Sequence, residues 1–163
     1  MKNENEILNI ITKDLKNAGY EPQRLNDEGV DSVGFVMPLM KDGVGKVYVQ
    51  MFFRPLTEEM SRLVFFTVLI NGCEHSMAEL EKALPQWNLE AAIGCYGVSP
   101  EEGQLFHKYD LLTAEDDQPL EIGLQTQRVL YALSQELVGR LGVARALATG
   151  KMTLAAAKQK GYC

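Results

Sequence analysis

The sequence predicts an α+β fold in which an antiparallel sheet of about five strands is combined with helices, in the order α-β-β-β-α-β-β-α. Three observations predict this class. Apolar residues recur at helical spacing near both ends of the chain and once in the middle, alternating apolar residues lie between these segments, and turn-forming residues separate the alternating segments. At 163 residues the chain can bury one core without disulfide bonds.

The first helix is predicted by the spacing of apolar residues near the start of the chain. Four of them fall on one face of a helix, with charged residues between them: Ile7, Leu8, Ile11 and Leu15. Gly19 ends this helix, because glycine readily takes the left-handed conformation found at helix C-termini. An extended connection follows from Pro22.

Two runs of alternating apolar residues, at 33–39 and 47–53, predict a β-hairpin. Asp42-Gly43 lies between them and is a dipeptide typical of hairpin turns. Because side chains alternate across a strand, the second run places four apolar residues on a single face: Val47, Val49, Met51 and Phe53.

A continuous apolar run at residues 63–70 predicts a third strand that is covered on both faces. Ser76 and Glu79 then have the spacing of a capping box, which predicts a helix that ends near Pro85. Two more strands are predicted at residues 92–98 and 105–111, separated by a Pro-Glu-Glu-Gly turn.

The longest helix is predicted at residues 120–148, where a broad apolar stripe recurs at helical spacing. Gly139 and Gly142 weaken it and predict a bend or a close helix contact. We therefore expect a single α+β domain at residues 1–148 and a short basic helical tail at residues 149–163.

The net charge of −6 argues against general nucleic-acid binding, which needs many lysines and arginines. The charge is uneven, because all 22 acidic residues lie at or before Glu136, and the five charged residues beyond it are basic. Two interpretations stay open for these basic residues. They suit the C-termini of helices, or they dock on an acidic surface such as a second subunit.

The chain is expected to act in the cytoplasm. Its polar first 15 residues do not resemble a signal peptide, and no run approaches the roughly 20 apolar residues of a membrane span. The three cysteines form an odd set without close pairs, which suits a reducing compartment.

A catalytic or metal site receives little support from the sequence. The metal-like residues are scattered and lack the paired spacing of zinc sites: Cys73, His75, Cys95 and His107. No phosphate-loop or dinucleotide motif is present, so no cofactor, metal or catalytic residue is predicted. The alternative is a small-ligand-binding domain or enzyme with a site near Cys73, His75 and His107.

The run at residues 63–70 carries bulky side chains on both faces, and one face needs a cover. That cover is a second subunit or a bound peptide, or else the sheet lies between the first and last helices.

The element order over residues 4–142 resembles the type III secretion chaperone fold, including the related YbjN-like proteins of bacteria. The most detailed resemblance is in the helix at residues 76–84, then Pro85-Gln86-Trp87-Asn88-Leu89, then the strand, turn and strand ending Phe106-His107-Lys108-Tyr109-Asp110-Leu111. The basic tail after Gly142 has no counterpart in the family pattern.

This resemblance implies a homodimer that binds a client protein instead of catalysing a reaction. Members of the family hold an extended segment of their client against apolar patches and sheet edges. Carried over to this chain, the resemblance implies a partner-binding surface of seven residues: Val47, Val49, Met51, Phe53, Val64, Phe66 and Val68.

Overall fold

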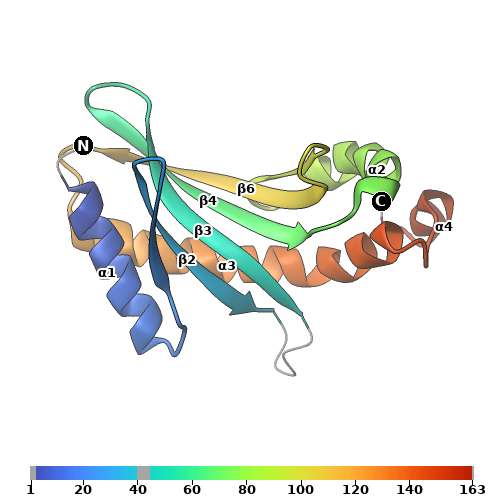
Figure 1. The fold of residues 1–163 in the computed structure, drawn as a ribbon, viewed down its shortest axis with the longest axis horizontal. Coiled ribbons are helices and arrows are strands. Elements are labelled where there is room, and N and C mark those ends of the chain that lie inside the picture. The colour runs from blue at the N-terminus through green and yellow to red at the C-terminus, as the bar shows by residue number, and fades with distance from the viewer. Residues whose placement is uncertain (1–2, 40–44, 163) are drawn as a thin grey trace. The chain divides into compact units, whose positions relative to one another are not determined.

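The structure is a computed structural model that describes residues 3–39 and 45–162. It confirms the α+β class, with one antiparallel sheet of six strands and four α-helices in the described part of the chain (Figure 1). The predicted Asp42-Gly43 turn lies outside the described residues. None of the described helices combines the length and hydropathy that crossing a bilayer requires.

The helices are α1 (Glu4–Asn17), η1 (Glu74–Ser76, a 3₁₀ turn), α2 (Met77–Glu90), α3 (Pro119–Ala148) and α4 (Leu154–Gln159). The strands are β1 (Gln23–Asp27), β2 (Val30–Pro38), β3 (Lys46–Pro55), β4 (Met60–Ile70), β5 (Cys95–Ser99) and β6 (Gln104–Ala114). Neighbouring strands in the sheet follow the order β1-β2-β3-β4-β6-β5, so β1 and β5 form its edges.

The chain divides into two compact units. Unit 1 comprises Met1–Met37, Tyr48–Phe66 and Tyr109–Ala132. Unit 2 comprises Pro38–Val47, Thr67–Lys108 and Leu133–Cys163, and so includes the basic tail.

β1 is the sixth strand, which the sequence pattern did not predict. It pairs with β2 from Gln23 opposite Gly34 to Asp27 opposite Val30. A two-residue turn joins the strands, with φ of +49° at Glu28 and φ of +82° at Gly29. Positive φ at both central residues is typical of the type I′ hairpin turn. β1 escaped prediction because an edge strand with no buried residue carries no apolar alternation.

Unit 1 buries the predicted face of α1 against one face of the sheet. Ile7, Leu8 and Ile11 are 2% exposed or less, as are Val49 and Met51 of β3. Burying a side chain of this size contributes about 1.5–3 kcal/mol.

Unit 2 has its own core around Trp87 of α2. Trp87, Leu80 and Ala83 are fully buried, together with Leu133 and Leu137 of α3. The indole Nε1–H of Trp87 donates a hydrogen bond of 3.0 Å to the main-chain oxygen of Tyr162. The tail is therefore bonded to the core of unit 2.

Three helix predictions need correction. Pro85 lies inside α2 and does not end it. Ser76 makes no capping hydrogen bond to α2; its hydroxyl donates instead to the main-chain oxygen of Ala148 at 2.7 Å. Gly139 and Gly142 mark no close helix contact, because a Cβ atom at either position would meet nothing within 4 Å beyond the local backbone of α3, which continues through both.

Candidate functional site

An exposed apolar surface on the sheet of unit 1 is formed by alternate residues of neighbouring strands. We name it the open face and define it by five residues from β2, β3, β4 and β6: Val36, Tyr48, Phe52, Phe66 and Leu112. Val36 is 53% exposed, Leu112 is 57% exposed and Tyr48 is 37% exposed, whereas Phe52 and Phe66 are half-buried.

The open face follows from strand geometry. Successive side chains point to opposite faces, so each exposed residue alternates with a buried one. In β3, for example, Tyr48 and Phe52 alternate with Val49, Met51 and Phe53, which are 0%, 0% and 7% exposed. The buried set faces the core of unit 1, and the exposed set faces away from it.

Contacts between strands hold the aromatic part of the open face in place. The Tyr48 ring lies over Gly34 of β2, because a Cβ atom at Gly34 would collide with the Tyr48 hydroxyl. An aromatic ring covering a strand glycine stabilises the sheet where glycine has no side chain to pack. Burial on this face raises the pKa of the Tyr48 hydroxyl above its ordinary value.

Polar groups lie beside these apolar side chains. Arg62 and Asp110 form a salt bridge of 3.1 Å between β4 and β6. The guanidinium carbon of Arg54 lies 5.6 Å from the centroid of the Phe52 ring, within the range of a cation–π interaction. The open face thus combines apolar side chains with charged groups.

The structure places the seven predicted partner-binding residues on two different faces. Val47, Val49, Met51 and Phe53 lie on the covered face and are between 0% and 7% exposed. These four residues are core residues and do not form an exposed surface. Alternation shows which residues share a face, but it does not show which face the helices cover.

The other three predicted residues lie on β4. Val64 is 1% exposed, because β4 is a central strand with neighbours on both sides. Phe66 and Val68 are half-buried, and Phe66 belongs to the open face of unit 1. Sequence reasoning missed Val36, Tyr48, Phe52 and Leu112. The signal that could have found them is the same alternation, read at the intervening positions.

Cys73, His75 and His107, the residues of the alternative site, lie in unit 2. Cys73 is 2% exposed, and its thiol donates to the main-chain oxygen of Gly103 at 3.1 Å. Burial raises the pKa of the Cys73 thiol, which disfavours the nucleophilic thiolate. His75 is exposed in η1. The described residues contain no group of three or more His, Cys, Asp or Glu side chains that could hold a metal ion.

His107 is fully buried on β6. Its Nε2–H donates to the main-chain oxygen of Ile93 at 2.8 Å, and its Nδ1 has no hydrogen-bond partner among the described atoms. Burial lowers the pKa of His107, so the neutral ring is favoured. Its ring packs edge-on against Tyr96, with centroids 4.9 Å apart.

Tyr96 connects this histidine to α3. Its hydroxyl donates to Oε1 of Glu136 at 2.7 Å, and Oε2 of the same carboxylate accepts from the main-chain N–H of Ala92 at 3.1 Å. Burial and the neighbouring Glu136 carboxylate raise the pKa of Tyr96. The cluster is a packed, hydrogen-bonded part of the core of unit 2.

Comparison with models of known protein families gives no match to this chain. Comparison with curated protein sequences gives none either.

Proposed function

We propose that this protein is a non-catalytic protein-binding module whose open face holds an extended segment of a partner protein. The observation that carries the proposal is the exposure of Val36 and Leu112, 53% and 57%, on strands whose opposite face is buried. Exposed apolar residues on one face of a sheet favour association, because contact with a partner removes them from water.

The shape and chemistry of the open face suit an extended segment. Its side chains are alternate residues of neighbouring strands. A partner in extended conformation can therefore place its own alternate apolar side chains against them. The salt bridge between Arg62 and Asp110 and the exposed Arg54 give polar partners to the main chain of such a segment.

The resemblance in element order over residues 4–142 adds to this proposal. It implies a chaperone-like or YbjN-like protein that acts in the cytoplasm as a homodimer and holds a client. The alternative, a ligand or enzyme site near Cys73, His75 and His107, has less support, because Cys73 and His107 are buried.

The test uses a permanently unfolded client, reduced and carboxymethylated α-lactalbumin, with binding measured by fluorescence anisotropy. The double variant Val36→Ser/Leu112→Ser removes two apolar contacts, and we expect it to weaken binding by at least about tenfold. The matched control is Leu124→Ser, since Leu124 is also 57% exposed but lies on α3.

Equal client affinity in the open-face variant and in the wild type would contradict the proposal. Sedimentation of the client-free protein tests the homodimer separately. If a dimer forms through the open face, Val36→Ser/Leu112→Ser dissociates it and Leu124→Ser does not.

A further inference from the structure

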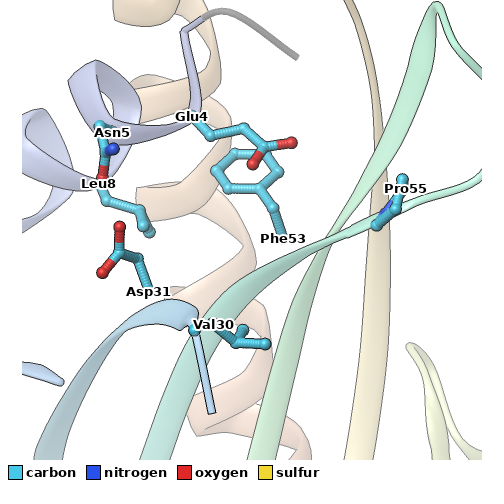
Figure 2. A pocket seen from close by; sticks show the side chains of 8 residues that line it. Glu4, Asn5, Leu8, Val30, Asp31, Phe53 and Pro55 are labelled. Atoms are coloured by element: carbon cyan, nitrogen blue, oxygen red, sulfur yellow. The ribbon is translucent and has the colours of Figure 1, made fainter. Parts of the chain in front are cut away.

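Unit 1 contains a pocket of about 250 Å³ that is separate from the open face (Figure 2). It lies where the first turn of α1 meets the β1–β2 turn and the end of β3, and eight residues line it: Glu4, Asn5, Leu8, Gly29, Val30, Asp31, Phe53 and Pro55. It is slightly smaller than the pockets of drug-sized ligands, so it suits a small molecule or one side chain.

Two residues of the apolar wall of the pocket belong to the core of unit 1. Leu8 is 1% exposed and Phe53 is 7% exposed. Val30, at the start of β2, and Pro55, at the end of β3, complete this wall nearer the surface. The Phe53 ring is one part of the wall that can attract a cation through its π face.

The polar wall is held by hydrogen bonds to neighbouring elements. Asn26 donates to Oδ1 of Asp31 at 2.8 Å, which fixes that carboxylate on β2. Ser61 of β4 donates to Oε1 of Glu4 at 3.1 Å. Figure 2 shows the carboxylates of Glu4 and Asp31 and the Phe53 ring bordering the same hollow.

Both the lining of the pocket and unit 1 as a whole carry net negative charge. Of the described residues that line the pocket, two are acidic and none is basic. The nearest cation that the structure bonds to the lining is the guanidinium of Arg24, which donates to Oδ1 of Asn5 at 3.0 Å. Unit 1 as a whole carries 14 acidic and 7 basic side chains, whereas unit 2 carries 8 acidic and 9 basic side chains. A cation entering this pocket therefore gains from the local field, and an anion does not.

We propose that this pocket binds an alkylammonium group, with the ammonium between the Asp31 and Glu4 carboxylates and the alkyl chain against Leu8 and Phe53. The inference does not rest on the protein-binding function proposed above, because none of the lining residues belongs to the open face. The ammonium can come from a free amine or from a lysine side chain of a protein partner, since both present the same chemistry.

The test titrates n-butylammonium chloride into the full-length protein and follows the methyl NMR signals of Leu8 and Val30. We expect saturable shifts in the millimolar range, because a ligand of so few atoms binds weakly. n-Butanol and butyrate have the same alkyl length without the positive charge, and neither is expected to saturate these signals. Raising sodium chloride from about 50 to 500 mM is expected to weaken n-butylammonium binding, because salt screens exposed charges.

Asp31→Asn removes one negative charge and is expected to raise the dissociation constant about fivefold. Glu21→Gln is the matched control, because Glu21 is an exposed acidic residue of unit 1 outside the pocket. It is expected to change the constant by less than about twofold. Phe53→Leu keeps an apolar wall but removes the ring, and a twofold to threefold loss is expected from the lost cation–π interaction.

N-acetyl-lysine methylamide distinguishes the two sources of the ammonium. Tighter binding than n-butylammonium assigns the pocket to a lysine side chain of a protein, and weaker binding assigns it to a free amine. The proposal is overturned if n-butanol binds as tightly as n-butylammonium or if no saturable shift occurs up to about 100 mM. The butanol comparison uses the wild-type protein, so it holds even if a variant fails to fold.

Discussion

The side-chain carboxamide of Asn88 bonds to both main-chain polar groups of Tyr96. Its Oδ1 accepts from the Tyr96 N–H at 2.6 Å, and its Nδ2 donates to the Tyr96 carbonyl oxygen at 3.0 Å. Tyr96 lies on β5, an edge strand of the sheet. Edge strands present main-chain groups that can pair with another chain. Asn88 thus occupies the main-chain groups of Tyr96, so that they cannot pair with another chain.

Asn88→Ala is expected to lower the free energy of unfolding by about 1–2 kcal/mol, because two main-chain groups lose their partners. It also opens the edge, so we expect concentration-dependent self-association. Urea denaturation measures the first effect and sedimentation velocity the second. Glu81→Ala is the control, because it introduces alanine at another exposed position of α2. Unchanged stability and mass in Asn88→Ala would show that the edge does not need this cover.

The stability of the protein is expected to fall as the pH drops below about 6.5, the ordinary pKa of histidine. Burial lowers the pKa of His107 in the folded state, so the unfolded chain binds its proton at a higher pH than the folded chain does. The stabilising contribution is therefore complete above the unfolded pKa. It decreases by at most about 1.4 kcal/mol per pH unit until the folded pKa is reached.

Urea denaturation at several pH values between 5 and 8 checks this prediction. His107→Leu removes the titrating group and is expected to flatten the curve near pH 6, even if it lowers stability at every pH. His75→Gln is the matched control, because His75 is exposed and is the other histidine of the chain. If the free energy of unfolding of His107→Leu depends on pH as steeply as that of the wild type, His107 is not the cause.

The two described cysteines are expected to be alkylated at different rates. Cys95 is exposed, whereas Cys73 is buried with its thiol bonded to the Gly103 carbonyl oxygen and its pKa raised by burial. In a Cys163→Ser background at pH 8, iodoacetamide should modify Cys95 within minutes and Cys73 only on unfolding. Peptide mass spectrometry measures both rates. Equal alkylation rates for Cys73 and Cys95 would support the alternative of a reactive site at Cys73.

Removal of residues 153–163 is expected to expose Trp87, the only tryptophan of the chain, and shift its fluorescence to longer wavelength. Tyr162 provides the main-chain oxygen that accepts from both Trp87 and Arg140, and Leu154 is buried in α4. We expect the free energy of unfolding to fall by about 1–3 kcal/mol, mainly from lost apolar burial.

The control for the tail is Lys158→Gln/Lys160→Gln, which removes two exposed charges and keeps the length of the chain. If the charge of the tail holds it in place, this variant shifts the fluorescence as much as the truncation does. We expect no shift, because the described anchors of the tail are main-chain and apolar groups.

Much of the fold could be predicted from the sequence, because local patterns fix local structure. The apolar spacing of α1, the alternation in β3 and the long stripe of α3 each predicted an element that the structure contains. Ser76 shows the limit of such patterns. Its spacing to Glu79 matches a capping box, yet its hydroxyl donates to Ala148, which is 72 residues away in the chain.

The open face could be predicted only in part. Alternation correctly grouped Val47, Val49, Met51 and Phe53 on one face of β3, but it did not show that this face is the buried one. The two carboxylates of the pocket also come from separate elements, since Glu4 begins α1 and Asp31 lies in β2. A pocket made by separate elements leaves no local signal.

The sequence by itself determined the α+β class, the positions of most helices and strands, and which residues share a face of each predicted strand. These features depend on the period of apolar residues, which each segment carries within itself. Only the tertiary structure decided which face is covered, that Asn88 closes an edge and that His107 is buried without a partner for its Nδ1. Those outcomes depend on contacts between residues far apart in the chain, and no local pattern records them.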